Sequence, residues 1–205
     1  MAAEYRSTVK KYKLDGAIVD DALIDPMNLT LISGVKSFLD QAGGATNPFF
    51  LLSVERDAAA LSKIMEGGFT DIFTKPVDAS MFFQKLRVYF SKIKFLKESL
   101  LFNLKVNSTL ELALACKLLN ASEFGMTVRL NRELHAGELF PIYGKMFGLH
   151  SGNCLARVLS CAATNSKVGD EKYEAVLLFI APRRDFLTNM RLWLRQEYVR
   201  AREPG

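Results

Sequence analysis

The first part of the chain alternates short apolar segments with helical segments, and this alternation constrains the fold more than any other feature. Strands are predicted at 15–20, 49–53 and 71–74, and helices at 29–39, at 57–66 and from Asp78 into the nineties. Parallel strands need a long crossover connection, usually a helix, whereas antiparallel strands do not. The alternation therefore predicts an α/β domain whose three-strand parallel sheet is covered by helices.

The second part of the chain changes to a series of short strands. They are predicted at about 100–106, 110–119, 125–130, 138–143, 154–163 and 172–181. Six short strands separated by turn residues are typical of a small β-barrel. Residues 183–202 then place their apolar side chains on one broad helical face. We therefore expect two domains, 1–91 with the partial parallel sheet and 92–205 with an all-β, six-stranded barrel and a C-terminal helix.

Charge and cysteine content narrow the class of protein. The formal net charge is +5 and the basic residues are spread over both halves, so nucleic-acid binding is not indicated. The three cysteines form no Cys-x-x-Cys pair, which indicates reduced thiols in a cytoplasmic protein. No apolar run approaches the roughly 20 residues that a membrane helix needs, so membrane insertion is not expected.

Polar residues follow each predicted strand of the first domain. Asp20 ends the first strand, Ser53 ends the second, and Lys75-Pro76 follows the third. Together with the run at 68–76, these residues resemble the C-terminal part of a response-regulator receiver domain over residues 14–90. The resemblance implies a phosphoacceptor at Asp20, a hydroxyl at Ser53 that tracks the phosphate, a contact from Lys75 and a cis bond before the proline.

The chain departs from the receiver pattern where that family binds Mg²⁺ with two acids on an earlier strand. The residues before Asp20 leave no room for that strand, and Asp21 is expected to point to the opposite face. We therefore interpret Asp20, Ser53 and Lys75 as a remnant that holds no metal. The missing strands leave strand 15–20 as an apolar edge, which predicts pairing with a second copy or another protein.

A second resemblance lies in the predicted strand–turn–strand junction at 120–125. Its spacing, Asn120-x-Ser122-x-x-Gly125, is similar to a signature of PilZ domains, which are small β-barrels that in many cases bind cyclic di-GMP. The likeness extends over about residues 92–202. It implies a nucleotide site near this turn, although Asn, Ser and Gly are also ordinary turn residues.

The other PilZ signature is a pair of arginines that grip the nucleotide. In the matching segment this chain offers Lys92, Lys94 and Lys97. Lysine lacks the flat guanidinium fork that binds bases and phosphates in a bidentate manner. We therefore expect a degenerate module that does not bind cyclic di-GMP tightly.

The C-terminal helix carries a narrow stripe of arginines. Its members are Arg184, Arg191, Arg195 and Arg202. Their spacings are close to whole helical turns, so the side chains share one face. Such a stripe is either a solvated surface or a docking surface for an acidic partner, and both interpretations stay open.

Function is predicted from these combined features. The motifs Gly-x-Ser-x-Gly and His-Glu-x-x-His and a Gly-rich phosphate-binding loop are absent from the sequence, so we do not expect an enzyme. The favoured hypothesis is a non-enzymatic bacterial signalling adaptor, related to two-component systems, that acts through protein–protein contacts. Two alternatives remain: a cyclic di-GMP effector with an atypical site, and a phosphorylation-controlled response regulator.

Overall fold

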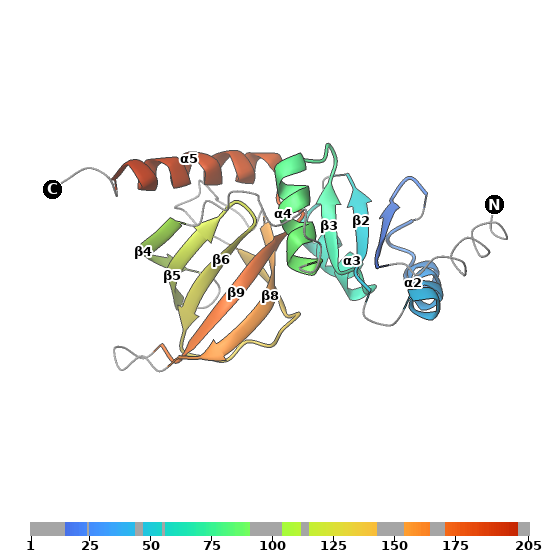
Figure 1. The fold of residues 1–205 in the computed structure, drawn as a ribbon, viewed down its shortest axis with the longest axis horizontal. Helices are drawn as coiled ribbons and strands as arrows, with labels where there is room; N and C mark the ends of the chain where they lie inside the picture. Colours follow the sequence, from blue (N-terminus) through green and yellow to red (C-terminus); the bar gives the residue numbers. More distant parts are fainter. Residues whose placement is uncertain are drawn as a thin grey trace. The chain divides into compact units, whose positions relative to one another are not determined.

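Figure 1 shows the fold of the chain in a computed structural model. The structure describes residues 15–23, 25–43, 47–54, 56–90, 104–111, 115–142, 154–164 and 171–200. The chain divides into two compact units, Met1–Val77 and Asp78–Gly205. The division groups the helix that follows Asp78 with the second unit, whereas the expected division at residue 91 placed it with the first.

The sheet of the first unit has three parallel strands in the order β1-β2-β3, as the alternation of strands and helices predicts (Figure 1). The strands are β1 (Ala17–Asp20), β2 (Phe49–Ser53) and β3 (Asp71–Thr74). The register pairs Asp20 with Leu52 and Ser53 with Thr74. The carboxyl ends of all three strands therefore meet at one edge of the sheet.

The helices in the described part of the first unit are α2 (Leu29–Gly43) and α3 (Ala58–Glu66). Asp57 begins α3 as its N-cap, because its Oδ1 accepts a hydrogen bond of 2.7 Å from the Ala60 amide. The chain leaves α3 through Gly68, whose φ of +98° lies in the region that favours glycine. The buried apolar side chains are Ile32, Phe49, Phe50, Leu51, Leu61, Ile64, Met65, Phe69, Ile72 and Phe73.

β1 forms an edge of this sheet. It pairs with β2 on one side and, within the described residues, with no strand on the other. None of its four residues is buried, whereas four of the five residues in β2 are buried. The prediction that the first strand is an edge is confirmed for this part of the chain, and of its apolar residues Ile18 is exposed while Ala17 and Val19 are half-buried.

The second unit contains an antiparallel sheet with strand order β4-β5-β6-β9-β8-β7. The strands are β4 (Leu104–Glu111), β5 (Ala115–Ser122), β6 (Gly125–Leu130), β7 (Leu139–Ile142), β8 (Cys154–Ala163) and β9 (Tyr173–Ile180). The strands predicted at 125–130 and 154–163 have these bounds in the structure. β4 and β5 begin and end several residues later than the strands predicted at 100–106 and 110–119. β5 therefore reaches Ser122, and the turn between β5 and β6 is shorter than predicted.

The second sheet is open, and the prediction of a closed six-stranded barrel is wrong. A closed barrel needs hydrogen bonds between its first and last strands. Here β4 and β7 stand at the two ends of the order and, among the described residues, pair only with β5 and β8. Alternating side chains identify the buried face of each strand, but they do not determine whether the end strands meet.

Where the structure describes the second unit, its helices are α4 (Ala79–Tyr89) and α5 (Arg184–Arg200). Asp78 is the N-cap of α4, as predicted, and its Oδ1 accepts a 3.0 Å hydrogen bond from the Met81 amide. Met81 and the α5 residues Phe186, Leu187 and Met190 belong to one core with the sheet. None of the helices in the described ranges is long and apolar enough to span a bilayer.

Candidate functional site

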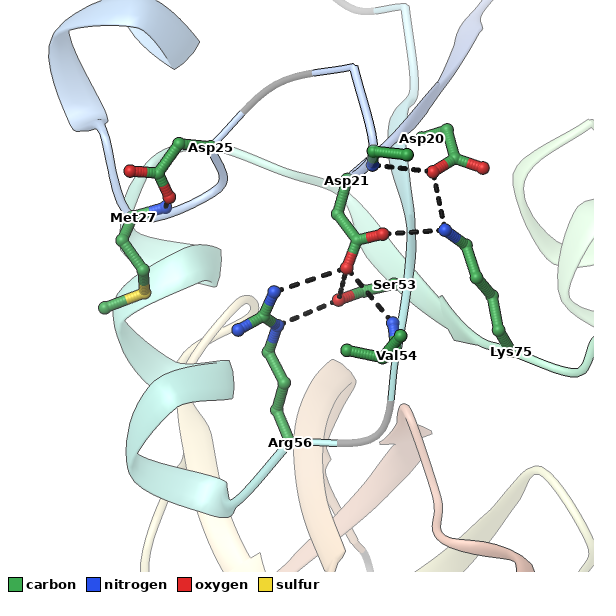
Figure 2. Close-up of polar contacts among 9 residues, drawn as sticks. Asp20, Asp21, Asp25, Met27, Ser53, Val54, Arg56 and Lys75 are labelled. Carbon is green, nitrogen blue, oxygen red and sulfur yellow. Dashed lines mark hydrogen bonds and ion pairs between the residues drawn. The ribbon is translucent and has the colours of Figure 1, made fainter.

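The carboxyl ends of the three parallel strands bring Asp20, Ser53 and Lys75 together (Figure 2). Main-chain hydrogen bonds fix the order of the strand ends. The Asp21 amide donates to the Leu52 carbonyl oxygen at 2.9 Å, and the Lys75 amide donates to the Ser53 carbonyl oxygen at 2.7 Å. The Lys75–Pro76 peptide bond is cis, as expected.

Lys75 pairs with two carboxylates at once (Figure 2). Its Nζ lies 2.5 Å from Asp20 Oδ1 and 2.7 Å from Asp21 Oδ1. Asp20 Oδ1 also accepts a 2.7 Å hydrogen bond from the Ala22 amide. Asp20 and Lys75 are both partly exposed. One ammonium group therefore links the ends of β1 and β3 across β2.

Asp21 is the enclosed member of the site, with only 8% of its side chain exposed. Its Oδ2 accepts hydrogen bonds from Ser53 Oγ at 2.7 Å, from the Val54 amide at 3.1 Å and from Arg56 Nη2 at 3.2 Å. Arg56 Nε also donates to Ser53 Oγ at 2.9 Å. Two carboxylates and two cations therefore pair with one another, so their charges balance within the cluster.

The hydrogen bonds shift the pKa values of Asp20, Asp21 and Lys75 toward the charged forms of these groups. The Lys75 hydrogen bond lowers the pKa of Asp20. Burial raises the pKa of Asp21, but hydrogen bonds from Lys75 and Ser53 outweigh it and hold that pKa well below its usual range. The hydrogen bonds to Asp20 and Asp21 raise the pKa of Lys75. At neutral pH Asp20, Asp21 and Lys75 are therefore charged.

The prediction that Asp21 points away from the site is wrong. Strand alternation does not extend to Asp21, because β1 ends at Asp20 and the chain turns there. A lysine side chain is also long enough to reach carboxylates that start on different sides of a strand end. Arg56 was not predicted at all, because it lies in the loop before α3, where no spacing rule connects it to Asp21.

The chemistry open to the cluster depends on Asp20, because Asp21 is enclosed. Asp20 Oδ1 makes the hydrogen bonds described above, and among the described residues its Oδ2 has no hydrogen-bond partner. A carboxylate oxygen accepts a phosphoryl group only when the developing charge is neutralised, usually by Mg²⁺. In the ranges that the structure describes, no cluster of three or more His, Cys, Asp and Glu side chains is arranged to hold a metal ion.

In the second unit, Ser122 and Gly125 shape the turn between β5 and β6. Ser122 is buried, and its Oγ donates a 3.0 Å hydrogen bond to the Gly125 carbonyl oxygen. A Cβ atom on Gly125 would collide with the Leu177 carbonyl oxygen, so β6 needs glycine to approach β9. Both residues therefore have a structural role in the hairpin.

The other nucleotide-binding candidates are not brought together by the described structure. Asn120 lies on β5, opposite Thr127 of β6 and next to an irregularity in the strand register. The three lysine candidates, Lys92, Lys94 and Lys97, lie outside the described residues. The nucleotide site that the turn motif implies therefore remains a prediction.

Arg191 is engaged in ion pairs within the second unit. Its Nη2 lies 2.8 Å from Asp78 Oδ2 and 2.6 Å from Glu123 Oε2, and its Nε donates to Glu123 Oε2 at 2.7 Å. Arg191 therefore fastens α5 to the start of α4 and to the β5–β6 turn. No sequence spacing indicates this long-range contact, which was not predicted.

The remaining arginines of the predicted docking stripe differ from Arg191. Arg184 and Arg195 lie on α5 with exposed side chains, and Arg202 lies outside the described residues. The stripe is therefore divided, because Arg191 holds the unit together while Arg184 and Arg195 face solvent.

Comparison with protein-family models, curated proteins and solved structures found no match for this chain.

Proposed function

We propose that the chain is a non-enzymatic signalling adaptor of the bacterial cytoplasm that acts through protein–protein contacts. In this proposal the first unit is a receiver remnant, and the second is a degenerate PilZ-like module. The observation that carries the proposal is the self-paired cluster, in which Lys75 and Arg56 neutralise Asp20 and Asp21. Charges already satisfied by one another favour a structural role for these residues at the end of the sheet.

The edge strand supports the contact-based part of the proposal. β1 leaves one side unpaired within the described residues, and Ile18 at its centre is 47% exposed. Open strand edges with exposed apolar side chains are common sites of association. The function then follows from the surface of the first unit rather than from chemistry at Asp20.

Affinity capture with variants tests this proposal. The tagged full chain, the edge variant Ile18→Lys and the site variant Asp20→Asn are each incubated with the same lysate and with untagged chain. We expect Ile18→Lys to lose the captured partners and Asp20→Asn to keep them. Capture that depends on Asp20 and ignores Ile18 would contradict an adaptor that works through this edge.

A phosphorylation-controlled regulator is the second candidate, because Asp20 is partly exposed and its Oδ2 is unused among the described residues. This function needs a cation to neutralise the phosphoryl group, in competition with Lys75. Calorimetric titration with Mg²⁺ tests it directly. Heat of binding that disappears in Asp20→Asn supports this candidate, and no heat supports the adaptor.

A cyclic di-GMP effector is the third function in question, and the buried, hydrogen-bonded Ser122 gives it no support. We expect calorimetric titration of the full chain with cyclic di-GMP to show no tight binding. Micromolar or tighter binding would instead place this chain among nucleotide effectors.

A further inference from the structure

The free side of β1 can be assigned residue by residue. The Ala17 amide donates to the Pro48 carbonyl oxygen at 3.0 Å, and the Asp21 amide donates to the Leu52 carbonyl oxygen at 2.9 Å. In a parallel strand, alternate residues direct their N–H and C=O groups to the same neighbour. Ala17, Val19 and Asp21 therefore face β2, and Ile18 and Asp20 direct their main-chain groups away from it. The Asp20 carbonyl oxygen already accepts a 2.9 Å hydrogen bond from the Leu23 amide, which uses one of its two lone pairs.

Exposed apolar side chains occur on β1 and in the chain that follows it. Ile18 is 47% exposed at the centre of β1, and Leu23 in the turn after β1 is 80% exposed. Met27 and Leu31, which follow along the chain to the start of α2, are also exposed. Among the described residues the main-chain groups of Ile18 have no partner on this side, and its side chain is exposed, so the edge is suited to adding a strand from another chain.

We propose that β1 pairs in antiparallel fashion with β1 of a second copy of this chain, about a two-fold axis at Ile18. This inference rests on the proposed adaptor function and names its partner. In this register, the main-chain groups of the two Ile18 residues bond to each other. Ala17 of each copy then stands opposite Val19 of the other, and Gly16 stands opposite Asp20.

The edge is self-complementary in this register. The two exposed Ile18 side chains cover each other, and the small Ala17 leaves room for Val19. Asp20 stands opposite a glycine, and its charge is held by Lys75 within its own chain. Just beyond the ends of β1, Asp15 stands opposite Asp21, whose carboxylate is paired with Lys75 and Arg56 of its own chain. In a two-fold contact the β1 edges of the two copies pair with each other, so association stops at a dimer. A head-to-tail contact would continue into fibres.

Cysteine cross-linking tests the register. Residues in a hydrogen-bonded antiparallel pair have Cα atoms about 5.5 Å apart, which is within disulfide range. We expect Ile18→Cys to form a covalent dimer on mild oxidation of the full chain. The control is Val54→Cys, because Val54 is also exposed and lies in the same unit beyond the end of β2. The unchanged chain gives the background from its own cysteines, of which Cys116 and Cys154 are buried.

Sedimentation at tens of micromolar tests the association itself. We expect the unchanged chain to form a dimer, Ile18→Lys to be monomeric with an unchanged circular dichroism spectrum, and Leu192→Lys to stay dimeric. Leu192 is an exposed α5 residue in the other unit and serves as the matched control.

Several results would overturn the proposal: an unchanged chain that is monomeric, a dimer that survives Ile18→Lys, or cross-linking of Val54→Cys as fast as Ile18→Cys. A monomeric chain that still captures another protein through Ile18 would overturn only the self-pairing. A different result overturns the adaptor function, namely capture of partners that is lost in Asp20→Asn and kept in Ile18→Lys.

Discussion

Lys75 Nζ lies 2.7 Å from Asp21 Oδ1, so the lysine that follows β3 holds the carboxylate that follows β1. These two strands do not pair with each other, because β2 lies between them. The ion pair therefore ties both outer strands of a small sheet together at one end. It stabilises the edge on which the proposed contacts depend.

Removing the buried carboxylate tests the role of the cluster in stability. Asp21→Asn keeps the size of the side chain but loses charge-assisted hydrogen bonds with Lys75 and Arg56. We expect the free energy of unfolding of the first unit to fall by about 2 kcal/mol. Asp20→Asn serves as the control and should cost less, because Asp20 is partly exposed and has fewer partners.

Urea unfolding followed by amide exchange in β2 measures this change in the first unit. Tryptophan fluorescence is not suited to it, because the single tryptophan, Trp193, lies on α5 of the second unit. Equal losses for Asp21→Asn and Asp20→Asn would show that the enclosed position of Asp21 is unimportant.

The same cluster predicts how stability depends on pH. The pKa values of Asp20 and Asp21 are lowered in the folded state, so their contribution is present above the unfolded value of about 3.9 and is lost as pH falls through the folded values. The pKa of Lys75 is raised, so its contribution is lost as pH rises through that folded value, above about 10.4.

We therefore expect the urea midpoint of the first unit to be level between about pH 5 and pH 9 and to fall at more acid pH. In Asp21→Asn the fall of the urea midpoint at acid pH should be less steep, because one carboxylate with a lowered pKa is absent. If the fall of the urea midpoint at acid pH is unchanged in this variant, other carboxylates are its cause.

Glycine at 125 is predicted to be essential for the second sheet. Gly125→Ala drives a Cβ atom into the Leu177 carbonyl oxygen, and overpacking of this kind costs about 1–3 kcal/mol. Gly34→Ala is the matched control, since nothing lies within 4 Å of a Cβ atom there and Gly34 lies in α2. Thermal unfolding should show a loss for Gly125→Ala and a gain of about 0.5–1 kcal/mol for Gly34→Ala.

The Arg191 ion pairs are predicted to contribute modestly to the second unit. Arg191→Ala should lower its free energy of unfolding by about 0.5–1 kcal/mol, because the guanidinium is partly exposed. Arg195→Ala, on the exposed face of the same helix, should have almost no effect. A double-mutant cycle with Glu123→Gln measures the coupling, and a coupling of zero would show that the contact adds nothing.

Strand and helix positions in the first unit follow from the sequence because the signals are local. α3 and α4 begin directly after Asp57 and Asp78, close to where the helices are predicted to start, and the apolar run 49–53 forms the buried central strand. The polar residues at the strand ends also meet as expected, since parallel strands finish at one edge of the sheet.

Long-range relationships could not be predicted in the same way. Nothing in the pattern around Arg56 points to Asp21, and Arg191 pairs with Asp78 across more than half of the chain. The openness of the second sheet depends on whether β4 and β7 meet, which the alternation within each strand does not encode.

The most direct test of an adaptor without chemistry at Asp20 is the intact mass of the chain after treatment with acetyl phosphate and Mg²⁺. The paired cluster predicts an unchanged mass, identical to that of Asp20→Asn treated in parallel. A gain equal to one phosphoryl group that is absent from Asp20→Asn would contradict the account and establish Asp20 as a working phosphoacceptor.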